Sequence, residues 1–200
     1  MQRRAFLNSI LATAGVGLLP GVARAAGECM RPDHLGVQRC SVGIHSNIAN
    51  VFARSQENTQ WCWAACIEML FRYYNHPVSQ ARIVNETFGN IVNMPAGPWN
   101  ILRALNRQWT DDNGRVFFVQ ADTMTANLIT AHDDLFANNP LIVGTLGHAM
   151  VLTGISYDRT RFGSQITEMV VRDPWQRRGR RVLNLQEAFN ISFLVRVRIT

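Results

Sequence analysis

The chain has 200 residues, of which 47% are hydrophobic and 17% are charged, and this composition is typical of a globular protein rather than a disordered one. The formal net charge is +6, and Arg3, Arg4 and Arg24 near the N-terminus supply half of it. All 20 basic residues of the Lys and Arg type are arginines, and they form no basic stripe after the N-terminal region. The charge therefore gives no reason to expect a nucleic-acid partner.

Residues 1–25 have the pattern of an export signal. Arg3 and Arg4 precede a short apolar stretch, and Ala23 and Ala25 supply the small residues of an A-x-A cleavage site. The arginine pair is similar to a twin-arginine signal, and an ordinary Sec signal is the alternative. We therefore expect an exported protein, periplasmic or secreted, with no stable membrane insertion once the signal is removed.

Residues 26–55 are polar and rich in turn residues, and we expect them to form an N-terminal arm. Cys29 and Cys40 flank a short polar loop in this arm, and an exported chain permits a disulfide between them. Together with His34 and His45 the same cysteines could instead form a zinc site, although the spacings are not those of a common zinc finger. Two unpaired thiols are a further alternative.

Residues 56–139 contain four predicted helices. The segment 61–75 lacks Gly and Pro and is apolar nearly all round, as in a buried helix. A second helix is expected over 79–88, capped by the serine at its start, and two more over 97–109 and 125–138.

Residues 140–200 change to short apolar or β-branched runs separated by turn residues: "PLIVGTL", "HAMVLTGISYD", "EMVVRDPW" and "SFLVRVRIT". Helices followed by strands indicate the α+β class. We therefore expect one domain over 56–200, with a helical part (56–139) packed on a small antiparallel sheet (140–200) and a functional cleft between them.

Three residues in this domain suggest nucleophilic catalysis. Cys62 opens the buried helix, where the helix dipole and free N–H groups favour a thiolate. His148 begins a predicted strand and Asp173 ends the next one, so the histidine could activate the thiol while the carboxylate orients the ring. Gln56 precedes Cys62 in a loop, and its amide could join the Cys62 N–H in an oxyanion hole.

The pattern Gln56-x5-Cys62-Trp63 resembles the papain-like superfamily of cysteine peptidases. "WCWAA" at the start of a helix looks similar to the small bacterial members, which include effector proteases of plant pathogens and leader-peptide peptidases of bacteriocin exporters. In the latter a Gly-His strand and an Asp-Pro strand end follow in the order seen here in "GHAMVLTG" and "RDPW". The resemblance covers about residues 56–200.

This resemblance implies a papain-like fold in which the cysteine helix faces a histidine on the sheet, with no metal or cofactor. Cys62, His148 and Asp173 would form the triad, and Gln56 would help to bind the oxyanion. Two features depart from papain itself: Asp173 stands in place of an asparagine, and Cys66 lies four residues after the nucleophile rather than three.

Several residues compete for these roles. His132 lies among acids on a predicted helix, which is typical of a solvated face, and Asp158 resembles a turn residue between strands. Gln60 competes with Gln56 as the oxyanion donor, but its short distance to Cys62 leaves less room for the loop to fold back. Cys66, one turn below Cys62, is expected to be a buried thiol, because a bridge within a regular helix would be strained.

Five residues are candidates for lining the cleft: Gln60, Trp61, Trp63, Gly147 and Trp175. We expect the two tryptophans beside Cys62 to pack on the histidine side and shield the ion pair. The run "RRGRR" at 177–181 is predicted to be a solvated hairpin tip, with a contact for an acidic substrate or an anionic surface as the alternative.

The sequence therefore predicts an exported cysteine peptidase that acts on a protein or peptide substrate. A transglutaminase, an acyltransferase or a peptidoglycan amidase could use the same Cys-His-Asp set. A papain-like domain kept as a catalytically silent binding module is the non-enzymatic alternative. The sequence predicts no oligomeric state and no cleavage specificity.

Overall fold

The computed structural model of the chain describes residues 27–124 and 127–200, so the predicted export signal lies outside the described residues. The helices are α1 (Ser46–Phe52), α2 (Cys62–Tyr73), α3 (Gln80–Phe88), α4 (Pro98–Leu105), α5 (Leu128–Phe136) and α6 (Leu185–Phe189). None of the helices in these two ranges is long and apolar enough to cross a membrane.

The strands form one antiparallel sheet in the order β1-β2-β6-β5-β9-β4-β3, and β7 joins β6 to β8. Their bounds are β1 (Glu28–Cys29), β2 (Gln38–Gly43), β3 (Gln108–Thr110), β4 (Val116–Met124), β5 (Leu141–Thr145), β6 (His148–Thr160), β7 (Gly163–Asp173), β8 (Gly179–Val182) and β9 (Ile191–Ile199). Strand β6 is central, because β5 and then β2 pair along one of its edges while β7 pairs along the other.

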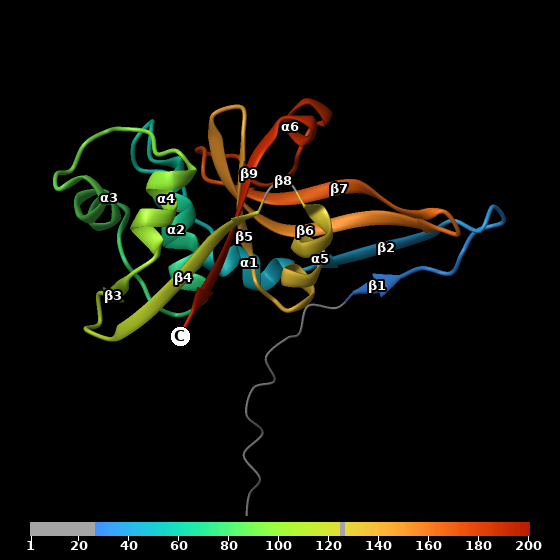
Figure 1. Ribbon diagram of the computed structural model, residues 1–200, viewed down its shortest axis with the longest axis horizontal. Coiled ribbons are helices and arrows are strands. Elements are labelled where there is room, and N and C mark those ends of the chain that lie inside the picture. The colour runs from blue at the N-terminus through green and yellow to red at the C-terminus, as the bar shows by residue number, and fades with distance from the viewer. Residues whose placement is uncertain (1–26, 125–126) are drawn as a thin grey trace, which may run out of the picture.

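Each face of the sheet has its own hydrophobic core. Ile142 and Val151 pack with α2 on one face, whereas Val143 and Met150 pack with α5 on the other, as expected for side chains that alternate along a strand. Helices α2, α3 and α4 gather at one end of the molecule, and β2, β6 and β7 extend beyond the helices at the opposite end (Figure 1).

Helix α2 is the buried helix predicted over 61–75. Its residues from Trp63 to Phe71 are all buried, and the chain leaves the helix through Asn75, which has a left-handed φ of 64°. Ser79 accepts a hydrogen bond from the Arg82 N–H at the start of α3, as the predicted cap requires. The predicted α+β architecture, with the cysteine helix packed on an antiparallel sheet, is confirmed.

Two segments differ from the prediction. The expected arm contains β1, β2 and α1, and β2 pairs with β6 inside the sheet. Residues 108–124, assigned to the helical part, form β3 and β4, and β4 pairs with β9. The alternating burial of "VFFVQADTM" in β4 is the strand pattern that the prediction missed. Cys29 and Cys40 face each other in the β1–β2 register and form a disulfide.

Candidate active site

Cys62 is the first residue of α2, next to the N-cap residue Trp61, and its side chain is half-buried. The first N–H groups of a helix have no partner within the helix, and their dipoles favour a negative charge. The backbone N–H groups of Trp63 and Ala149 hydrogen-bond to the Cys62 sulfur. The helix start and the first residues of β6 therefore meet at this thiol.

His148 is held at the beginning of β6 by a tight turn. Leu146 and Gly147 form the two-residue connection between β5 and β6, with φ values of 50° and 76°, and Thr145 pairs directly with His148. A turn with positive φ at both central residues matches the twist of the paired strands. The hairpin thus places His148 where β6 begins, beside the start of α2.

Asp173 ends β7 on the other side of His148. His148 Nε2 lies 2.7 Å from Asp173 Oδ1, and the imidazole also hydrogen-bonds to the thiol of Cys62. Because Nε2 is engaged by the carboxylate, Nδ1 is the ring nitrogen left for the sulfur. Three residues far apart in the sequence therefore form one hydrogen-bonded series, Cys62–His148–Asp173.

The electrostatics of this series favour an ion pair. Burial alone raises the pKa of Cys62, but hydrogen bonds from His148 and the backbone lower it below its usual range. Burial opposes the charge on His148, yet the hydrogen bonds to Asp173 and Cys62 raise its pKa to about 9. Burial likewise opposes the charge on Asp173, and donors led by His148 lower its pKa to about 2. The imidazolium of His148 therefore stabilises the negative charges of Cys62 and Asp173, and these two charges stabilise the imidazolium.

Arg181 holds Asp173 from the side away from His148. Its Nε donates to Asp173 Oδ2 at 2.7 Å, and its two terminal nitrogens bind the Glu187 carboxylate of α6. Asp173 also accepts a hydrogen bond from the Trp175 N–H at 2.8 Å. The prediction of a solvated hairpin tip was wrong for Arg181, because this residue lies in β8 and its side chain is largely covered.

Gln56 lies beside this site in a buried loop. Its backbone N–H donates to the Pro174 carbonyl at 2.7 Å, which ties the loop to the strand end that carries Asp173. The side-chain Nε2 donates to the carbonyls of Asn58 and Thr59, and the buried Oε1 has no partner among the described residues. In this state both amide hydrogens of Gln56 are used within its own loop.

Two buried polar residues brace the Gln56 loop. Gln80 of α3 donates to the carbonyl of Ser55 and accepts from the N–H of Glu57, so it holds the residues on both sides of Gln56. Its Nε2 also donates to Glu68 of α2 at 2.8 Å. This brace was not predicted from the sequence, although Glu68 within the largely apolar α2 was a signal for it.

Trp61 and Trp63 do not shield the histidine as expected. Both are buried in the core beneath α2, and their indole N–H groups donate to the carbonyls of Val92 and Met94. They therefore anchor the loop between α3 and α4. Gln60 is exposed, and its N–H donates to the side chain of Asn93 in the same loop.

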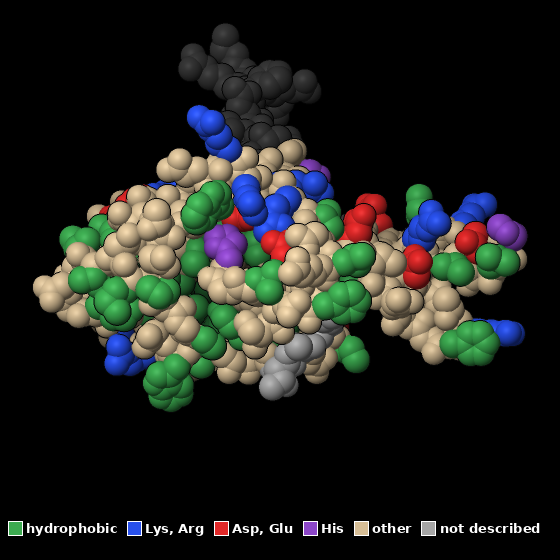
Figure 2. Space-filling view, turned by 90° about the horizontal axis from the view of Figure 1, so that it is seen from above, with side chains coloured by type: hydrophobic (Ala, Val, Ile, Leu, Met, Phe, Trp, Pro, Cys, Tyr) green, Lys and Arg blue, Asp and Glu red, His purple; other side chains and the backbone are tan. Residues whose placement is uncertain are grey.

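The residue that covers His148 is Trp175. Its ring packs edge-on against the imidazole at 6.1 Å between centroids, and the side chain is 45% exposed. Leu146 and Gly147 are exposed in the turn on the other side of His148. Seen from above, a histidine lies among hydrophobic side chains on the broad body of the molecule, with basic and acidic side chains beside it, and the narrow extension carries acidic, basic, histidine and hydrophobic side chains (Figure 2).

The residues that were alternatives for the catalytic roles do not join the Cys62–His148–Asp173 series. His132 on α5 contacts Asp133 and the hydroxyl of Tyr157. Asp158 is not a turn residue as predicted, because it lies within β6. Cys66 is free and fully buried, and burial raises the pKa of its thiol well above the usual range.

The zinc alternative requires two cysteines that are not available as thiolates. Cys29 and Cys40 form a disulfide, so neither sulfur can serve as a metal ligand in this structure. The bridge ties β1 to β2, and Cys40 pairs with Tyr157, which lies toward the end of β6 opposite to His148.

The model of the Peptidase_C39 like family matches residues 48–196, which include every residue of the series and Gln56. The peptidase domain of Streptococcus ComA, a bi-functional ABC transporter involved in a quorum sensing pathway, has a similar structure, with a TM-score of 0.52. The two chains are 16% identical, and the match covers 74% of this chain and 96% of that domain. A search of the curated proteins found no match. Because the family match spans most of the sequence, the chain belongs to the Peptidase_C39 like family, within the papain-like superfamily of cysteine peptidases.

Proposed function

We propose that the protein is an exported cysteine peptidase that hydrolyses peptide bonds with Cys62 as its nucleophile. The observation that carries the proposal is the hydrogen-bonded series Cys62–His148–Asp173 at the start of a buried helix. Nucleophile, base and orienting carboxylate follow in hydrogen-bond order, which is the arrangement that acyl transfer requires.

In the proposed reaction the Cys62 thiolate attacks the carbonyl carbon of the substrate and forms a tetrahedral oxyanion. The His148 imidazolium then donates its proton to the leaving amine, and a thioester remains on Cys62. Water attacks the thioester with His148 as the base, and the acid product leaves. Asp173 keeps Nδ1 of His148 directed at the sulfur throughout.

The oxyanion would lie between the Cys62 N–H and the side-chain amide of Gln56. Both amide hydrogens of Gln56 are bound to loop carbonyls in this structure, so one of them has to turn toward the oxyanion when substrate binds. Catalytic hydrogen bonds often tighten only in the complex. The brace by Gln80 keeps the backbone of this loop in place while the amide turns.

Export is the other half of the proposal. The Cys29–Cys40 disulfide supports it, because such bonds persist mainly in oxidising compartments. The N-terminal sequence of the protein recovered from its native host tests this point. A mature chain that begins near residue 26 and is found outside the cytoplasm is expected, and a cytoplasmic chain that retains Met1 would contradict it.

The activity is tested with Cys62→Ala, and Cys66→Ala serves as the matched control on the same helix. We expect the first variant to lose hydrolysis of an unfolded protein such as casein while its thermal melt stays near that of the wild type. The control should keep its activity. Hydrolysis retained by Cys62→Ala would refute the proposal, and release of amines from peptidoglycan instead of casein cleavage would identify an amidase.

A further inference from the structure

Arg172 is a buried charge with few partners. It precedes Asp173 on β7, and because side chains alternate along a strand, the two point to opposite faces of the sheet. Its side chain is 1% exposed, and its Nη2 lies 3.5 Å from the carbonyl of Ser46 at the start of α1. Its Nε and Nη1 are buried and have no hydrogen-bond partner among the described residues.

The charges near Arg172 do not compensate it. Burial lowers its pKa, and the positive charge of Arg180 lowers it further. Arg180 lies directly opposite Arg172 in the β7–β8 register. Within residues 27–124 and 127–200 no carboxylate forms an ion pair with either arginine. Burying an unpaired charge costs free energy, so a negative charge bound at this face of the sheet would stabilise the protein.

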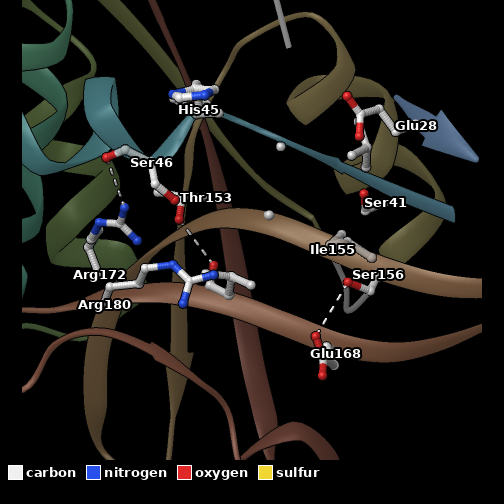
Figure 3. Close-up of a pocket in the computed structure, with 15 residues that line it drawn as sticks. Glu28, Ser41, His45, Ser46, Thr153, Ile155, Ser156, Glu168, Arg172 and Arg180 are labelled. Atoms are coloured by element: carbon white, nitrogen blue, oxygen red, sulfur yellow. Dashed lines mark hydrogen bonds between the residues drawn. The ribbon is translucent and has the colours of Figure 1, made fainter. Parts of the chain in front are cut away.

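Both arginines line a cavity of about 480 Å³ on this face. Ser46 and Thr153 line the same end and are drawn beside the two arginines in Figure 3, and His45 also lines the cavity. The acidic residues Glu28 and Glu168 line the opposite end, where Glu168 is engaged with the hydroxyl of Ser156. The basic end therefore has no carboxylate among its lining residues, and Arg180 is exposed there while Arg172 is buried beside it.

We propose that this cavity binds a small oxyanion, a carboxylate or a phosphate, between Arg172 and Arg180. A guanidinium group presents paired N–H donors that match the oxygens of such groups. The exposed Arg180 offers such donors to the cavity, and the neighbouring Arg172, whose Nε and Nη1 have no partner among the described residues, adds a second positive charge beside it. The site is distinct from the proposed peptidase centre, because Asp173 faces His148 and Arg181 on the other side of β7.

The test is a calorimetric titration of the full mature chain with inorganic phosphate and, separately, with acetate, in a buffer of low chloride. We expect saturable binding, and the anion that binds more tightly identifies the phosphate or the carboxylate as the ligand class. Arg180→Met should weaken it about 10-fold or more, because a hydrogen bond to a charged group is lost. Arg180 is exposed, so this variant keeps the core intact.

Arg161→Met is the matched control, since it removes the same charge from an exposed turn at the far end of β6 and β7. It should leave the binding of both anions unchanged. Equal weakening by Arg161→Met would show a general charge effect and overturn the proposal. The absence of saturable binding of either anion to the wild type would overturn it as well.

Arg172→Met gives an independent readout. In anion-free buffer this variant should melt at a higher temperature than the wild type, because an apolar chain of similar length replaces an unpaired buried charge. Added phosphate or acetate should raise the melting temperature of the wild type but not that of the variant. A variant that responds to the anion as the wild type does would contradict the assignment of Arg172.

Discussion

Asp173 and Arg172 are neighbours on β7, and both are buried charges, yet their surroundings differ. Asp173 accepts hydrogen bonds from His148, Arg181 and the Trp175 N–H, whereas Arg172 makes one long contact, with a backbone carbonyl, within the part of the chain that the structure describes. A buried charge is tolerated when its hydrogen-bonding capacity is filled. The charge of Asp173 is compensated by hydrogen bonds within the protein. The charge of Arg172 is not, and we proposed above that an external anion compensates it.

The network around Asp173 joins four elements of the fold. His148 belongs to β6, Arg181 to β8 and Glu187 to α6, while Asp173 itself ends β7. Asn184 and Glu187 form a capping box at the start of α6, which fixes the acid that holds Arg181. The orientation of His148 therefore depends on several packed elements rather than on one loop.

The largest effect is expected from Asp173→Asn. The amide keeps the shape of the side chain but cannot stabilise the imidazolium or fix its tautomer, so kcat/KM should fall about 10³- to 10⁴-fold. Arg172→Met, one residue away on the other face, should leave kcat/KM within about 2-fold. Kinetics with a fluorogenic peptide measure both. A comparable loss in the two variants would show that the two faces of β7 are not independent.

The next effect concerns the proposed oxyanion donor. Gln56→Ala should lower kcat about 10²- to 10³-fold, with a smaller change in KM, because one donor to the transition state is lost. Gln60→Ala is the control, since Gln60 is a nearby exposed glutamine in the same loop. If both variants retain wild-type kcat, Gln56 only shapes its loop and the backbone N–H groups hold the oxyanion alone.

A smaller effect is expected from Arg181→Met, because Arg181 is a positioning residue that acts through Asp173. We expect kcat to fall about 10-fold through looser placement of His148. Loss of the positive charge leaves Asp173 less compensated, so the pKa of His148 should rise further and the basic limb of the pH profile should move to higher pH. A basic limb that does not move, or that moves to lower pH, would contradict this role.

The smallest effect is on folding. Gln80→Ala removes the brace between α2, α3 and the Gln56 loop and leaves buried polar groups without partners. We expect the free energy of unfolding to fall by about 1–3 kcal/mol, measured by urea denaturation. The exposed Gln120→Ala should change it by less than about 0.5 kcal/mol. Equal values for the two variants would show that the brace does not stabilise the fold.

Local patterns made some of the structure predictable. The apolar run from Trp63 to Phe71 and the Ser79 cap depend on neighbouring residues, and α2 and α3 lie where they were expected. The candidate series Cys62, His148 and Asp173 was predictable from the resemblance, because the motifs "WCWAA", "GHAM" and "RDPW" mark it in chain order. The structure brings these three residues together at one point.

Other features depend on contacts between distant segments, which a single sequence does not display. Arg181 resembled a solvated residue within a basic run, because its partners Asp173 and Glu187 lie on other elements. Strand β2 resembled part of a polar arm because only alternate residues face the core. The indoles of Trp61 and Trp63 likewise bind carbonyls of a loop about 30 residues further along the chain.

The central claim is that Cys62 and His148 form a thiolate–imidazolium pair. It is tested by the rate of iodoacetamide alkylation as a function of pH in Cys66→Ala, where Cys62 is the remaining free thiol. We predict a reaction that persists below neutral pH, a second step near pH 9 where His148 loses its proton, and loss of the low-pH reaction in the additional variant His148→Ala. A single step near the free-cysteine pKa of about 8.5, unchanged by His148→Ala, would contradict the account.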